Sequence, residues 1–164
     1  KSLNMAFTIV EVKDPRVIAD LYLELKATKS LAAKEIYSDI FIESVMQSFK
    51  GNLIVLGAID QEGNVLAIRG AICRNGKATD MFAAMSSLGR SMSASHAVLF
   101  ALLEACKEKE CVIYDLNGID PTNSLGVYNF KKGTGAEAKA SLGEFEWSSS
   151  RMLQRAFNLV SKYR

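Results

Sequence analysis

The chain has 164 residues, 49% of them hydrophobic and 23% charged, with a net charge of +2 at pH 7. This length suits one domain and is marginal for two, and the balanced charge argues neither for nor against an anionic ligand. The apolar runs are too short for a membrane span. Three cysteines lack the spacing of metal ligands and each lies in an apolar run, so we expect small buried thiols, a reducing cytoplasm and no metal site.

The first third of the chain predicts a strand followed by two helices. Residues 7–12 alternate between apolar and polar, which is typical of a short strand. Asp14 as N-cap and Pro15 at the first helical position indicate that a helix begins there. A second helix is predicted from residue 32 or 37 to residue 49, with Ile40 and Ile42 buried.

Three antiparallel strands are predicted next. Apolar segments at 52–59, 65–73 and 78–85 are separated by two polar turns that contain glycine, which is the pattern of a meander. Arg69 and Arg74 alternate with apolar residues in this region, so we expect both side chains to face solvent.

The remaining chain predicts one more alternation of helices and strands. The expected elements are a Ser/Gly loop at 86–91, a helix at 93–109, a strand at 111–116, a helix at 124–132, a strand at 138–147 and a helix at 151–163. This order predicts a single α+β (mixed α/β) domain over residues 1–164, with a central, mostly antiparallel sheet flanked by helices.

A lysine pair beside a two-glycine turn is the strongest chemical signal. Phe130, Lys131 and Lys132 precede Gly133 and Gly135. A lysine beside such a turn can offer a positive charge to a phosphate, a carboxylate or an oxyanion. A helix that ends in lysines and a glycine is also ordinary C-capping, and this second interpretation fits Lys132 in particular.

Two other titratable residues are weighed against structural roles. Asp115, near the end of a predicted strand, is a candidate general base or ligand contact, but turn-capping by its carboxylate is the more frequent role. His96 is the only histidine, and it has no carboxylate or cysteine at a telling spacing, so we expect no chemistry from it.

The element order resembles the acetyltransferase-like (GNAT) fold of acyl-CoA N-acyltransferases. Four blocks in order then resemble the C-terminal half of the FemABX family: Leu53–Ala58 with Gly63–Ala67, Tyr114–Ile119, Gly126–Gly135 and Leu142–Glu144. The resemblance covers roughly residues 50–147. Members of that family are similar to two tandem acetyltransferase-like domains. They transfer amino acids from aminoacyl-tRNA to a peptidoglycan precursor.

The resemblance implies specific roles and partners for this chain. It makes Lys131 and Phe130 the catalytic pair, with Tyr128, Lys132, Asp115, Gly133 and Gly135 as candidate substrate contacts. It also implies aminoacyl-tRNA and a peptidoglycan precursor as partners, and no DNA. The chain begins with Lys1 and not with Met, which fits the back part of a longer protein, and the tandem architecture of the family implies a related domain upstream. Thr134 stands where the family usually has phenylalanine, which predicts a looser turn.

Two alternatives remain open. Gly89, Arg90 and Ser91 lie where CoA-dependent acetyltransferases carry a pyrophosphate-binding loop that opens a helix, and they would bind that cofactor if acyl-CoA is the donor. The chain shows only part of that motif. The other alternative is a half-domain that binds a ligand or a partner without catalysis, because a fold by itself does not fix an activity.

Overall fold

The computed structural model describes residues 6–29, 38–140, 149–153 and 155. The chain divides into two compact units, Lys1–Ser124 and Leu125–Arg164. The single domain expected over residues 1–164 stays a prediction. Within the described residues, no helix is long and apolar enough to cross a membrane.

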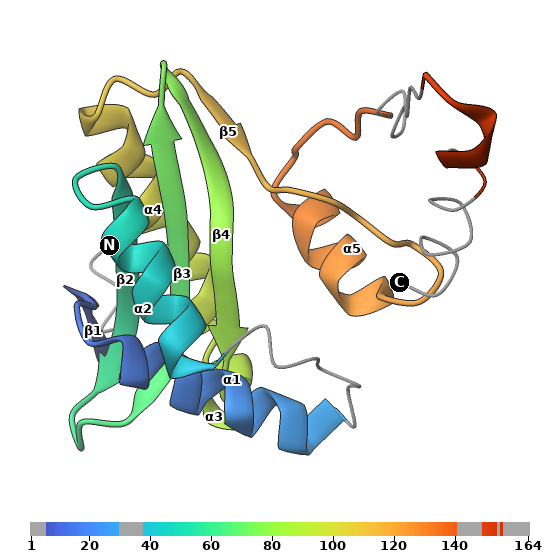
Figure 1. The fold of residues 1–164 in the computed structure, drawn as a ribbon. Coiled ribbons are helices and arrows are strands. Elements are labelled where there is room, and N and C mark those ends of the chain that lie inside the picture. The colour runs from blue at the N-terminus through green and yellow to red at the C-terminus, as the bar shows by residue number, and fades with distance from the viewer. Residues whose placement is uncertain (1–5, 30–37, 141–148, 154, 156–164) are drawn as a thin grey trace. The chain divides into compact units, whose positions relative to one another are not determined.

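The first unit is built on a sheet whose described strands lie in sequence order (Figure 1). The strands are β1 (Phe7–Glu11), β2 (Leu53–Asp60), β3 (Val65–Arg74), β4 (Lys77–Met85) and β5 (Ile113–Asp115). Pairs β1–β2, β2–β3 and β3–β4 are antiparallel, and β4–β5 is parallel. The predicted meander is confirmed, and the Asp60 carboxylate closes its first turn by accepting the backbone N–H groups of Glu62 and Asn64.

Helices cover both faces of this sheet (Figure 1). The described helices are α1 (Pro15–Lys29), α2 (Asp39–Ser48), α3 (Ser87–Ser91), α4 (Ala94–Glu108) and, in the second unit, α5 (Leu125–Gly133). Helices α1 and α2 pack on one face, where Ile18, Ile42 and Phe82 are fully buried. Helix α4 packs on the other face through Val98 and Leu102.

Some sequence predictions need correction or fall outside the described residues. Ile40 is 77% exposed, so its predicted burial is wrong, because α2 begins at Asp39 and turns Ile42 and Val45 inward instead. The predicted loop at 86–91 contains the short helix α3. Most of the strand predicted at 138–147 and of the helix predicted at 151–163 lies outside the described residues, although residues 151–153 are helical.

Strands β4 and β5 separate soon after they pair. Their register runs only from Lys77 opposite Ile113 to Thr79 opposite Asp115, whereas β4 continues to Met85. A bulge lies just beyond the last pair, because Ala71 faces Asp80 and Gly70 faces Phe82, which leaves Met81 as the extra residue. The carboxyl ends of two parallel strands therefore diverge at a point where the backbone of β4 is irregular.

Candidate active site

The divergence of β4 and β5 is the first candidate for a site. In open sheets, ligands bind outside the carboxyl ends of parallel strands, where neighbouring strands part. Backbone groups of β4 at this edge are met by side chains from other elements. The N–H of Ala83 donates to the Tyr22 hydroxyl on α1 at 2.8 Å, and the Asn117 amide donates to the Asp80 carbonyl at 3.1 Å. These contacts hold α1 and the end of β5 against the irregular part of β4.

A buried polar network lies beneath this divergence. The Arg69 guanidinium on β3 donates to the Asp80 carboxylate on β4 at 2.5 Å, and the two side chains are 4% and 7% exposed. The Tyr114 hydroxyl on β5 donates to the other carboxylate oxygen of Asp80 at 2.8 Å. Burial, with the negative charge of Asp80, raises the pKa of Tyr114 far above its usual range, so the phenol remains a hydrogen-bond donor at neutral pH.

This network corrects one prediction from the sequence. Arg69 does not face solvent, because the carboxylate of Asp80 compensates its charge inside the fold. Arg74 is exposed as expected, and its guanidinium lies 5.2 Å from the centre of the Phe49 ring. The sequence did contain a signal for this burial, namely an arginine and an aspartate in adjacent apolar strands. Charged side chains are rarely buried unless they are paired. Sequence reasoning also missed Tyr22, whose helical position resembles that of an ordinary core aromatic residue.

Asp115 lies at the end of β5 and binds the turn that follows. One carboxylate oxygen accepts the backbone N–H of Asn117 at 2.8 Å, and the other accepts the Lys77 ammonium at 2.7 Å. Both side chains of this ion pair are nearly half exposed, so the pair adds less than about 1 kcal/mol to stability. The contacts are those of a turn-capping residue, and a role for Asp115 in substrate binding stays a prediction.

The segment that holds Gly89, Arg90 and Ser91 is closed by internal hydrogen bonds. The amides of Gly89 and Arg90 donate to the side chain and carbonyl of Ser86, and the Ser91 hydroxyl donates to a carbonyl within α3. A Cβ atom on Gly89 would lie 1.9 Å from the Leu66 carbonyl oxygen, so close packing of α3 on β3 explains this glycine. The amides of Gly89 and Arg90 are therefore already used, whereas a pyrophosphate-binding loop directs its amides at the ligand.

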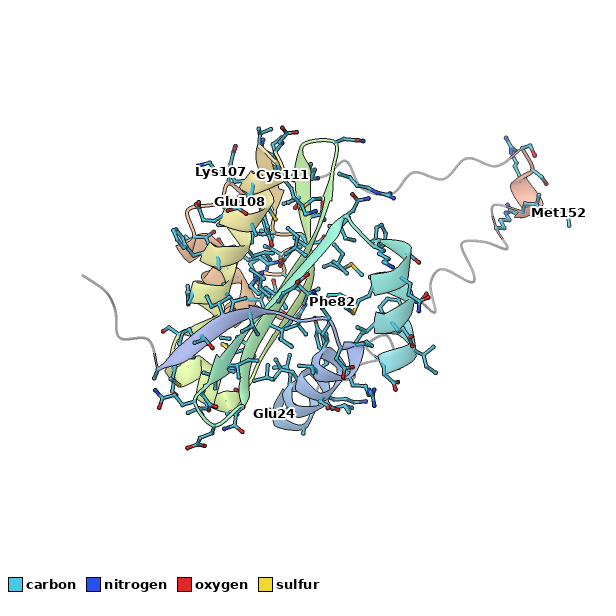
Figure 2. The ribbon with its side chains drawn as sticks, turned by 90° about the vertical axis from the view of Figure 1, so that its left-hand side faces the viewer. Glu24, Phe82, Lys107, Glu108, Cys111 and Met152 are labelled. Atoms are coloured by element: carbon cyan, nitrogen blue, oxygen red, sulfur yellow. The ribbon has the colours of Figure 1, made fainter. Side chains whose placement is uncertain are left out.

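A pocket of about 500 Å³ lies next to the same segment, between α1, the start of β3 and α3. Asp20 and Glu24 of α1 line it, and Glu24 accepts the backbone N–H of Ser87 at 3.3 Å. Figure 2 shows Glu24 on α1. Within the described part of the chain, no lysine or arginine lines this pocket. Two carboxylates repel a pyrophosphate, so the pocket does not favour CoA.

Helix α5 of the second unit carries the lysine pair. Phe130 and Lys131 are partly exposed neighbours in its last turns. The Lys132 ammonium lies 5.9 Å from the centre of the Tyr128 ring, one turn earlier. This contact gives Lys132 a packing role on its own helix.

The turn after α5 is held more firmly than its sequence predicts. The Thr134 hydroxyl donates to the Lys131 carbonyl at 2.6 Å, and the Thr134 backbone N–H donates to the same carbonyl. Gly135 adopts φ +79° and donates its N–H to the Lys132 carbonyl, as a C-capping glycine does. The expected loosening by Thr134 is thus wrong, since its hydroxyl fixes the backbone at Lys131. Gly133 ends α5 itself.

Comparison with known proteins decides the family. The model of the FemAB family matches residues 46–162. The chain belongs to the FemAB family. This confirms the resemblance seen in the four sequence blocks, and family membership supports an acyltransferase. No curated protein matches the chain.

Solved structures confirm the predicted acetyltransferase-like fold. A GNAT-family acetyltransferase from Staphylococcus aureus is similar with a TM-score of 0.67 and 16% identity, covering 86% of this chain and 94% of that one. Ard1 from Thermoplasma volcanium is similar with a TM-score of 0.63 and 20% identity, covering 82% of this chain and 85% of that one. Glucosamine-6-phosphate N-acetyltransferase from Arabidopsis thaliana has a TM-score of 0.59 and 12% identity, covering 87% of this chain and 99% of that one. At these identities the likeness concerns the fold alone.

Proposed function

We propose that this member of the FemAB family transfers an aminoacyl group from aminoacyl-tRNA to an amine of a peptidoglycan precursor. The observation that carries the proposal is the family match over residues 46–162, which includes the β4–β5 divergence and the whole of α5. Such a reaction takes place where aminoacyl-tRNA is made, so we expect the protein in the cytoplasm. A related upstream domain and the peptide precursor are the partners that the family resemblance implies.

The structure favours an aminoacyl ester over acyl-CoA as the donor. The amides of Gly89 and Arg90 are bound within their own segment, and the carboxylates of Asp20 and Glu24 lie in the adjacent pocket. Both features oppose a pyrophosphate at α3, because a CoA site needs free donors and positive charge there. An aminoacyl-tRNA donor makes no such demand on this segment.

Lys131 is the proposed catalytic residue. When the acceptor amine attacks the ester carbonyl, the carbonyl oxygen becomes an oxyanion, and the ester oxygen leaves with the tRNA as an alcohol. An ammonium directed at that oxyanion stabilises the intermediate by roughly 3–4 kcal/mol. Thr134 fixes the backbone from which Lys131 projects. Phe130, the preceding residue, would restrict water, and Tyr128, Lys132, Gly133, Gly135 and Asp115 are the proposed substrate contacts.

A transfer assay tests the proposal. Purified protein is mixed with a tRNA pool charged with radiolabelled amino acids and with a peptidoglycan precursor that carries a free amine. Label should move to the precursor, and Lys131→Ala should lower kcat by about 10²–10³-fold with little change in KM, since the interaction forms in the transition state. Lys139→Ala is the control, because Lys139 is an exposed lysine outside the proposed substrate contacts; it should retain kcat within about threefold.

Two results would overturn the proposal. Equal turnover by the parent and Lys131→Ala would remove Lys131 from the mechanism. A rise in melting temperature with millimolar acetyl-CoA, together with acetyl transfer, would show that the donor is a thioester. A ligand at about one hundred times its Kd adds roughly 2.7 kcal/mol to stability, which such a melting experiment detects readily.

A further inference from the structure

The three cysteines meet in the fold, although 33 and 5 residues separate them in the sequence. Cys73 lies on β3 and Cys106 on α4, and their Sγ atoms are 3.6 Å apart. Both side chains are buried, with 6% and 2% of their surface exposed. They belong to the apolar cluster in which α4 packs on the sheet. This distance is hydrogen-bonding contact between thiols, and no disulfide is present.

Cys111 extends this pair towards the surface. It follows α4, is half-buried, and packs against the cluster that holds Cys73 and Cys106. Its thiol donates to the Lys109 carbonyl at 4.0 Å. Its backbone N–H donates to the Cys106 carbonyl at 3.0 Å, which fixes the segment against the end of α4. Figure 2 shows Cys111 at this end of the helix, near Lys107 and Glu108. The partly exposed Cys111 therefore lies beside the buried pair of Cys73 and Cys106.

We propose that Cys111, Cys73 and Cys106 form a thiol relay, a modification site at which a small disulfide oxidant such as oxidised glutathione converts Cys73 and Cys106 into a disulfide. Cys111 is the entry point because it is the most accessible of the three. Within the described residues, no group of three His, Cys, Asp or Glu side chains is placed to hold a metal ion. The contact between the Cys73 and Cys106 thiols is what supports thiol–disulfide exchange at this cluster.

The relay proceeds in three exchanges, each by attack of a thiolate on a disulfide sulfur. The Cys111 thiolate attacks the oxidant, forms a mixed disulfide and releases one small thiol. The Cys73 thiolate then attacks the sulfur of Cys111, which releases the second small thiol and leaves a Cys73–Cys111 disulfide. Finally the Cys106 thiolate attacks the sulfur of Cys73 and frees Cys111. In sum, one oxidant molecule is reduced to two thiols, and two protein thiols become one disulfide.

The geometry suits the last step. A disulfide bond is about 2.05 Å long, so the 3.6 Å between the Cys73 and Cys106 sulfurs must shorten by roughly 1.5 Å. One sulfur belongs to a strand and the other to the helix packed on it, and small side-chain rotations supply movements of this size. The product would link β3 covalently to α4.

The surroundings of the cluster make the exchange slow at neutral pH. Burial, then Cys73, Cys111 and the carboxylate of Asp80, raise the pKa of Cys106 to about 12. Burial and Cys73 also raise the pKa of Cys111, although the ammonium of Lys109 opposes this. Tyr114 packs against the same cluster and remains neutral. Since the thiolate is the nucleophile, the rate should rise by roughly tenfold per pH unit below these pKa values.

Peptide mapping of the oxidised protein tests the relay. Reduced protein is incubated with oxidised glutathione at about pH 7.5 and about pH 9, quenched with acid, alkylated and digested without reductant. We expect a Cys73–Cys106 disulfide that forms faster at the higher pH. Cys111→Ala should form the same disulfide at least about tenfold more slowly, because its entry point is gone. Cys106→Ala should stop at the Cys73–Cys111 disulfide.

Two outcomes would contradict the relay. One is a glutathione adduct that stays on Cys111 while Cys73 and Cys106 remain reduced in the folded protein. The other is a rate in Cys111→Ala equal to that of the parent. Cys111 is the least buried of the three, so its variant keeps the test decisive even if substitution of Cys106 disturbs folding. The readout is a mass measurement and does not depend on any transfer activity.

Discussion

Replacing Asp80 by asparagine leaves the Arg69 guanidinium charged inside the sheet. The two side chains are 4% and 7% exposed, and their polar atoms lie 2.5 Å apart. Removing one partner of such a buried pair destabilises a protein by about 3–5 kcal/mol, because the remaining charge is no longer compensated. We therefore expect Asp80→Asn to lower the free energy of unfolding by this amount. That is a large share of the roughly 5–15 kcal/mol that stabilises a domain.

A double-mutant cycle separates the ion pair from other effects. Arg69→Met alone should lower the free energy of unfolding by less than Asp80→Asn does. Asp80 still accepts the Tyr114 hydroxyl in that variant, and its carboxylate can become neutral by taking up a proton. The double variant should be more stable than Asp80→Asn, since neither charge remains buried. Asp115→Asn is the matched control, because Asp115 forms an exposed ion pair with Lys77. It should lower the free energy of unfolding by less than about 1 kcal/mol.

Urea unfolding, followed by circular dichroism, measures these differences as shifts in the midpoint at constant slope. The interaction free energy from the cycle should exceed about 2 kcal/mol. If Asp80→Asn lowers the free energy of unfolding by less than about 1 kcal/mol, the argument is refuted. Such a small loss would mean that water, and not only Asp80, compensates the charge of Arg69. Strict additivity of the two single variants would refute it equally.

Three further predictions follow from single contacts. Gly89→Ala should destabilise by at least about 3 kcal/mol in urea unfolding, because its Cβ meets backbone at 1.9 Å, whereas Gly126→Ala meets nothing within 4 Å and should be neutral or stabilising. Tyr22→Phe deprives the Ala83 N–H of its acceptor, which should cost about 1–3 kcal/mol and speed hydrogen exchange at that amide. Stability should fall above pH 9, because the unfolded chain releases a Cys106 proton at about 9.0 that the folded chain holds to about 12. Cys106 contributes a slope of about 1.4 kcal/mol per pH unit in this range, and Cys106→Ala should make the fall less steep by that amount.

Local patterns in the sequence already determined most of the secondary structure and the fold. The meander followed from apolar alternation interrupted by turns with glycine, since Asp60 and Gly63 meet backbone requirements within a few residues. Helix α4 followed from its apolar spacing, with Val98, Leu102 and Cys106 buried. The order of elements and four sequence blocks, one of them around Lys131, then indicated the family. These signals are readable because propensity, capping and turn chemistry act between near neighbours in the chain.

Tertiary structure alone decided which distant side chains meet. Arg69 reads as a surface charge until Asp80 and Tyr114 are placed beside it across two neighbouring strands. The thiols of Cys73 and Cys106 read as separate small hydrophobes until α4 packs on β3. Burial of a charge or approach of two sulfurs is a sum of long-range contacts, which no local pattern encodes. The requirement for glycine at position 89 likewise comes from packing, because the Leu66 carbonyl of β3 leaves no room for a side chain on α3 there.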